Sequence, residues 1–166
     1  MIEPPLSGSE LVLVAQVPKA GSRWTQTHFN KDIIRQFFRA HEDDQRPLVF
    51  ERVESDGTLD PQTRRSLVKS SINLNPKIEL NFGFKEGKRA VYPKTGRPIA
   101  VILELDTRTF RYQTLMPGDQ GHEKMLAMTK QLPSSGKGVP RVITNLDEVE
   151  LRWPGCKLRS ARNPVF

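Results

Sequence analysis

Three residues of this chain have a spacing that loosely resembles the metal-binding motif of a nuclease. Asp60 precedes a Glu-x-Lys pair formed by Glu86 and Lys88. Magnesium-dependent cleavage needs carboxylates that share the ion and a lysine that polarises the nucleophile. The pair lies in the cationic stretch Lys-Glu-Gly-Lys-Arg, which repels a divalent ion and is typical of a hairpin tip. We therefore expect no catalytic site, and a small stand-alone Mg-dependent nuclease using Asp60, Glu86 and Lys88 is the alternative.

The histidines and the cysteine do not form a metal-binding pattern. His122 and Glu123 lack the His-Glu-x-x-His spacing of a zinc protease, so they are expected in the first turn of a helix. His28 and His41 have no cysteine or carboxylate at a ligand spacing. The single Cys156 excludes an internal disulfide and indicates a reducing, intracellular setting. No metal or cofactor is expected for this chain.

Positive charge is the main compositional feature. The 166 residues carry a formal charge of +7 with a pI of about 9.8, which favours an anionic partner. Lysine and arginine gather in residues 17–39 and 77–97, whereas residues 42–60 are rich in acids. This segregation favours a polyanion such as the phosphate backbone of DNA, and a solvated charged face is the competing interpretation.

Side chains that can read base edges are interleaved with these cations. Arginine suits guanine, asparagine and glutamine suit adenine, and glutamate accepts from cytosine. The candidates in the first basic segment are Arg23, Gln26 and His28, and those in the second are Glu86, Lys88 and Arg89.

The first basic segment has two halves of different chemistry. Its polar half, up to His28, is followed by Phe29, Ile33, Ile34, Phe37 and Phe38, whose spacing predicts one apolar face of a helix that ends near residue 41. Asn30 is the expected N-cap of that helix. A polar, cationic arm anchored by an apolar helix can hold flexible donors over a ligand.

Most of the remaining chain alternates like β-strands. Strands are expected at Leu11–Val17, Leu48–Val53, Leu67–Ile72, Lys77–Phe84, Arg89–Tyr92, Ile99–Leu105, Arg108–Met116, Val139–Ile143 and Val149–Trp153. A second helix is expected to begin at Asp119 as its N-cap and to bury Met125, Met128 and Leu132. The pattern predicts a mainly β fold with two helices, built as a partly open, mostly antiparallel barrel.

The chain is expected to be one domain with short extensions. Residues 1–9 are interpreted as a flexible N-terminus, 10–155 as the domain, and 156–166 as a basic tail or a linker to a catalytic domain. The longest apolar runs, Leu11–Ala15 and Ile99–Leu103, are too short to span a bilayer, so no membrane partner is expected.

A resemblance extends this interpretation. The strand, polar arm and helix FNKDIIRQFF resemble the start of the DNA-binding pseudobarrel of plant B3-type transcription factors, and more closely the N-terminal effector-binding domain of EcoRII-type restriction endonucleases. The stretches RPLVFERVESDGTLDPQTRRSLVKSSIN and FGFKEGKRAVYP resemble that family's next strands and its second DNA-gripping arm. The stretches GDQGHEKM and RVITNLDEVELRWPGC also resemble C-terminal DNA-binding domains of phospholipase-D-like restriction nucleases.

The resemblance implies two arms that enter the major groove of double-stranded DNA. On this chain the N-arm is Lys19–His28 and the C-arm is Asn81–Tyr92. The six base-edge candidates lie on these arms, and the implied phosphate contacts are Lys19, Ser22, Thr25, Lys85 and Lys94.

The resemblance also implies a cellular role. The chain is expected to be the effector or targeting domain of a restriction-modification system in the prokaryotic cytoplasm, monomeric when isolated, with magnesium required only by an attached or associated nuclease domain. Single-stranded RNA binding is a third option. It requires exposed aromatic side chains on a sheet face, for which the candidates are Tyr92 and Tyr112.

Overall fold

The computed structural model describes residues 10–17, 26–28, 31–40, 47–65, 68–69, 76–79, 92–131 and 140–162. Its strands are β1 (Leu11–Gln16), β2 (Gln26–His28), β3 (Leu48–Arg52), β4 (Thr63–Arg65), β5 (Val68–Lys69), β6 (Pro76–Glu79), β7 (Ile99–Asp106), β8 (Thr109–Leu115) and β9 (Arg141–Asn145). Its helices are α1 (Lys31–Gln36), α2 (His122–Gln131) and α3 (Leu146–Arg152). None of these three helices is long and apolar enough to cross a bilayer.

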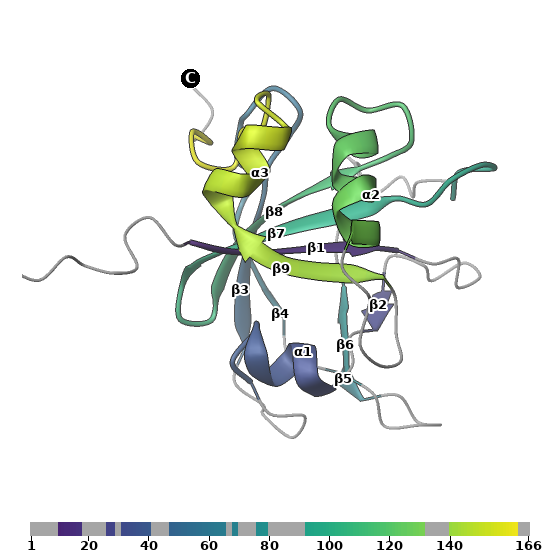
Figure 1. Cartoon of the computed structure of the whole chain (residues 1–166). Helices are drawn as coiled ribbons and strands as arrows, with labels where there is room; N and C mark the ends of the chain where they lie inside the picture. The colour runs from purple at the N-terminus through teal and green to yellow at the C-terminus, as the bar shows by residue number, and fades with distance from the viewer. Residues whose placement is uncertain are drawn as a thin grey trace, which may run out of the picture.

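Six strands form one mixed sheet in the order β4-β3-β8-β7-β1-β9 (Figure 1). All neighbours are antiparallel except β3 and β8, which run parallel with Phe50 opposite Phe110. Within the described residues the edge strands β4 and β9 do not pair with each other, so the sheet stays open. The prediction of a mainly β, partly open fold is confirmed, with three helices instead of the expected two.

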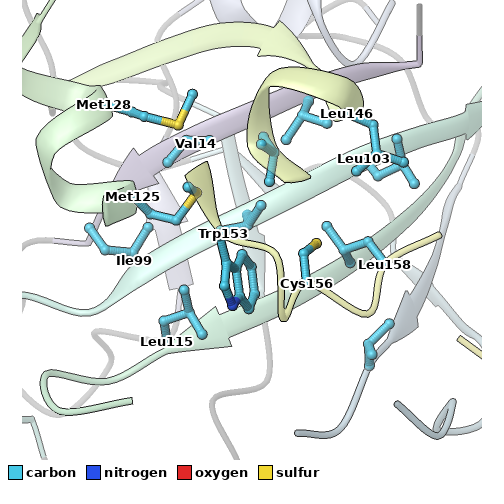
Figure 2. Close-up of a cluster of buried hydrophobic side chains, with 14 of the residues drawn as sticks. Val14, Ile99, Leu103, Leu115, Met125, Met128, Leu146, Trp153, Cys156 and Leu158 are labelled. Atoms are coloured by element: carbon cyan, nitrogen blue, oxygen red, sulfur yellow. The ribbon is translucent and has the colours of Figure 1, made fainter. Parts of the chain in front are cut away.

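The two faces of this sheet carry separate apolar clusters because side chains alternate along each strand. Figure 1 shows α1 on one side of the sheet and α2 and α3 on the other. On the α1 side, Phe38 packs against Phe110 with ring centroids 5.0 Å apart, and Phe50 packs against Phe110 at 5.6 Å. On the other side, Met125 and Met128 of α2 belong to a buried cluster with Val14 of β1 and with Trp153 (Figure 2).

Helix α1 is shorter than the sequence predicts but buries the expected residues. Ile33, Ile34, Phe37 and Phe38 are each 3% exposed or less, although the helix ends at Gln36. The chain turns at Arg39, whose φ of 55° is left-handed, so the two phenylalanines pack from the turn rather than from a longer helix. Phe29 and the expected cap Asn30 lie outside the described residues.

The prediction of a final strand at residues 149–153 is wrong, because that segment belongs to α3. The side chain of Asn145 accepts a hydrogen bond of 2.9 Å from the Glu148 amide, which caps the helix. Asp147 and Glu148 then place negative charge in the first turn, where the helix dipole favours it. The apolar residues Leu146 and Val149 are both buried at helical spacing.

Asp119 does not cap α2 as predicted. The helix begins three residues later at His122, and the Asp119 carboxylate instead accepts a hydrogen bond of 2.8 Å from the Met116 amide. The Asp119 carbonyl accepts from the His122 amide at 3.1 Å, so Asp119 closes the turn between β8 and α2.

The described part of the C-terminal extension packs against the sheet. Cys156 and Leu158 belong to the buried cluster beneath α2 and α3 (Figure 2). Arg159, which the sequence places in a basic tail, forms ion pairs with Glu10, Asp147 and Glu150. These contacts attach residues 156–162 to β1 and α3.

Candidate nucleic-acid interface

Most of the predicted contact residues fall outside the described residues. These are Lys19, Ser22, Arg23, Thr25, Lys85, Glu86, Lys88 and Arg89. Gln26 and His28 are placed by their backbones in β2, and Lys94 is exposed in the segment before β7. The assignments of individual base and phosphate contacts therefore stay predictions. The structure does describe the segments at which the two arms join the β-sheets.

One pair of arm ends meets in a small sheet of order β2-β6-β5. Strand β2 is the last part of the N-arm, and β6 leads directly into the C-arm. The two strands pair antiparallel, with Gln26 opposite Glu79 and His28 opposite Lys77. The N-arm therefore enters β2 at the point where the chain leaves β6 for the C-arm.

The other pair of arm ends meets at the large sheet. Val17 lies just before the N-arm, and Tyr92 is the last residue of the C-arm. The Tyr92 hydroxyl donates a hydrogen bond of 2.7 Å to the Val17 carbonyl oxygen. Burial raises the pKa of the Tyr92 hydroxyl, which keeps it a donor, while the nearby charge of Arg97 acts in the opposite direction. The two arms are thus joined at both of their roots.

A buried polar network fixes these roots to α2. Gln16, the last residue of β1, donates from Nε2 to the Thr129 hydroxyl at 2.9 Å. Its Oε1 accepts from the Arg97 guanidinium at 3.4 Å, and the Arg97 carbonyl lies 2.7 Å from Nε2 of His122. Gln16, His122 and Thr129 are each 5% exposed or less. Buried hydrogen bonds of this kind hold both root segments in one geometry.

The described cations include both exposed and ion-paired side chains. Lys94 and Arg97 are exposed beside the arm roots, and no acid among the described residues lies within ion-pair distance of either. Several arginines elsewhere are paired with acids: Arg52 with Glu54 and Asp60, Arg111 with Glu51, Arg39 with Glu104, and Arg159 with Glu10, Asp147 and Glu150. Other cations away from the arm roots are exposed, among them Arg64, Lys124 and Lys157. The acids of residues 51–60 therefore mainly neutralise neighbouring arginines.

The residues of the alternative nuclease site are only partly placed. Asp60 accepts a hydrogen bond of 2.7 Å from Arg52, which also binds Glu54 at 2.6 Å. Glu86 and Lys88 lie outside the described residues. Among the described residues, no group of three or more histidine, cysteine or acidic side chains could hold a metal ion. The Asp60 carboxylate is engaged in an ion pair in this structure.

The aromatic candidates for RNA stacking are not free on a sheet face. Tyr112 is 4% exposed and packs against Phe50 with ring centroids 5.9 Å apart. Tyr92 is half-buried, and its hydroxyl is bonded to Val17. Tyr112 therefore offers no open face for base stacking, and Tyr92 packs in part against the cluster on the α1 side.

The sequence did not reveal the residues that position the arms. Gln16 lies in an apolar stretch and His122 lies among polar residues, and neither setting gives a local signal of the residue's partner. The one available signal was Arg97, which belongs to the second basic segment but was not among the predicted contacts.

No protein-family model matches the chain, and no curated protein matches its sequence. Among solved structures, the N-terminal domain of Helicobacter pylori LlaJI.R1 aligns with a TM-score of 0.52 and 10% sequence identity, covering 81% of this chain and 97% of that one. The likeness shows a shared fold. Membership of the B3-like or EcoRII-type families remains a prediction.

Proposed function

We propose that this chain is a sequence-specific module for double-stranded DNA whose N-arm and C-arm enter the same major groove. The observation that carries the proposal is the joining of the arms at both roots, through Gln26 opposite Glu79 and through Tyr92 bonded to Val17. The major groove is about 12 Å wide, so two loops that read it together must leave the framework close to each other.

The electrostatics support an anionic partner on this side of the molecule. Lys94 and Arg97 are exposed beside the roots, and both arms carry further cations. Paired arginines elsewhere offer a phosphate backbone little net charge. A duplex bound at the arms gains affinity from counterion release without competing for these internal ion pairs.

The resemblance to EcoRII-type enzymes and the shared fold with the LlaJI.R1 domain support a more specific role. The chain acts as the effector or targeting domain of a type II restriction endonuclease. Cleavage and its magnesium requirement then belong to an attached or associated nuclease domain. DNA bound at this module either recruits that nuclease or relieves its inhibition, which is a coupling between two sites.

The test is selection of random duplexes at physiological salt, followed by sequencing of the bound pool. We expect a defined motif to be enriched, and the selected duplex to bind more tightly than a scrambled duplex of equal length. Failure of any duplex to compete with heparin for the protein would contradict sequence-specific DNA binding.

A matched pair of variants locates the interface. Lys94→Ala removes a cation beside the arm roots, and Arg64→Ala removes an exposed cation on β4, opposite Val49 at the other end of the sheet. Lys94→Ala is expected to lower the slope of log affinity against log salt by about 1, because one phosphate contact is lost. Arg64→Ala should leave the slope unchanged, and equal slopes for the two variants would place the DNA elsewhere.

A further inference from the structure

The start of the N-arm is hydrogen-bonded to two other parts of the chain. Gln16 is the last residue of β1, and Val17 follows it directly before the N-arm. The Gln16 amide donates to the Pro140 carbonyl at 3.1 Å, just before β9. The Val17 amide donates to the Pro98 carbonyl at 2.9 Å, between the C-arm and β7. These four residues form the root junction, at which the segments before β7 and before β9 meet the N-arm.

The side chain of Gln16 uses both polar ends of its amide at this junction. Its Nε2 donates to the Thr129 hydroxyl at 2.9 Å, and its Oε1 accepts from the Arg97 guanidinium at 3.4 Å. The Thr129 hydroxyl donates its own proton to the Leu126 carbonyl at 2.6 Å, so its oxygen is left to accept from Gln16. A donor must therefore face α2 while an acceptor faces Arg97, and the glutamine amide supplies both.

Gln16 is too buried to contact DNA itself. It is 5% exposed, and its partner Thr129 is 2% exposed. Hydrogen bonds at such depth are stronger than at the surface, and a buried amide with both partners in place favours one arrangement of the segments that carry them. Removing the amide leaves a buried partner unsatisfied, so the arrangement loses its advantage over displaced ones. The relative position of the arm roots therefore depends on this side chain.

We propose that Gln16 is a positioning residue that sets how well the chain discriminates between its target and other duplexes, without touching either. This role rests on the proposed function, because it concerns the two arms that read the groove. Base contacts depend on hydrogen-bond geometry, so they are lost when an arm shifts. Phosphate attraction depends mainly on the number of charges and survives such a shift. A loosened root junction therefore weakens specific binding and leaves nonspecific binding unchanged.

The test compares three variants by fluorescence anisotropy with the selected and the scrambled duplex. Gln16→Met keeps the length of the side chain and removes both polar ends, and Thr129→Val keeps the shape and removes the acceptor. Gln113→Met is the matched control. Gln113 is also buried, at 7% exposed, and lies on β8 opposite Val101. Its side-chain oxygen has no hydrogen-bond partner among the described residues, so it does not join the arm roots.

We expect Gln16→Met and Thr129→Val each to lower the ratio of the two affinities at least about fivefold, as for one lost base contact. Affinity for the scrambled duplex and its salt dependence should stay unchanged, because no charge is removed. The double variant should lose no more than the larger single loss, since the two residues act through one hydrogen bond. Gln113→Met should leave the ratio unchanged.

Amide hydrogen exchange gives a second readout that needs no DNA. The Val17 amide should exchange at least about fivefold faster in Gln16→Met than in the wild type, because the root junction opens more often when a buried hydrogen bond is lost. Gln113→Met should leave this rate unchanged.

An affinity ratio that survives both Gln16→Met and Thr129→Val would overturn the proposal, and so would an unchanged exchange rate. An equal loss in Gln113→Met would overturn it too, because general destabilisation would then explain the effect. Thermal unfolding checks each fold, and Thr129→Val decides alone if Gln16→Met does not fold. A wild type that does not discriminate contradicts the proposed function and this role together, whereas a discriminating wild type with unaffected variants contradicts only the role of Gln16.

Discussion

The hydroxyl of Tyr92 donates a hydrogen bond of 2.7 Å to the carbonyl oxygen of Val17, and so joins the end of the C-arm to the start of the N-arm. Removing this hydroxyl in Tyr92→Phe should lower the free energy of unfolding by about 1 kcal/mol, since one partly buried hydrogen bond is lost. It should also reduce discrimination between the selected and the scrambled duplex, because the arm roots can separate. Urea unfolding and fluorescence anisotropy measure the two effects, and unchanged values in both would show that this contact does not position the arms.

Gly121 should tolerate a side chain less well than Gly118. Both have positive φ, at 92° and 96°, but a Cβ at Gly121 meets the Trp153 indole, whereas nothing lies within 4 Å at Gly118. Gly118→Ala therefore carries only backbone strain of about 1 kcal/mol. Gly121→Ala adds overpacking of about 1–3 kcal/mol. Equal losses in urea unfolding would show that the indole moves aside without cost.

Cys156 should react slowly in the folded protein. Burial raises the pKa of its thiol to about 11, so the nucleophilic thiolate is scarce at pH 8.5. Alkylation by iodoacetamide at that pH should be much slower in buffer than in urea. Equal rates would mean that the thiol is accessible.

The same thiol should make stability depend on pH. The folded thiol holds its proton more tightly than the unfolded one, so the unfolded state ionises first and stability falls as pH rises from about 9 to about 11. The wild type should lose about 2 kcal/mol more than Cys156→Ala over this range. Parallel pH curves for the two proteins would contradict the burial of the thiol.

Asp60 should contribute to stability and not to cleavage. Asp60→Asn removes a charge-assisted hydrogen bond to Arg52 and should lower the free energy of unfolding by about 1–3 kcal/mol. The wild-type chain with magnesium should leave supercoiled plasmid intact. Nicking by the wild type that disappears in both Asp60→Asn and Glu86→Ala would support the alternative nuclease instead.

Much of the framework follows from local sequence patterns. The apolar run Ile99–Leu105 and the alternation in Arg108–Met116 predict two strands, which the structure places at Ile99–Asp106 and Thr109–Leu115. The spacing of Ile33, Ile34, Phe37 and Phe38 predicts which side of α1 is buried. Helix α3 was missed because its apolar residues were interpreted without the capping signal of Asn145 and Glu148. Periodicity alone does not separate a short buried strand from a short helix.

Features that join distant segments could not be predicted locally. The parallel pairing of β3 with β8 and the pairing of β2 with β6 each connect segments separated by many residues. The contacts of Gln16 with Thr129 and of Arg97 with His122 depend on the same long-range arrangement. The sequence indicated two basic segments, and the folded chain brings the roots of both to one place.

Random-duplex selection repeated with Arg23→Ala and Arg89→Ala tests the central claim most directly, because each arm contributes one of these arginines. If the two arms enter the same groove, each variant should lose base preference at the motif positions that its arginine contacts. The positions lost in Arg23→Ala and those lost in Arg89→Ala should then lie within about half a helical turn, roughly five base pairs, of each other. Relaxed positions a full turn or more apart, or an unchanged motif in both variants, would contradict the account.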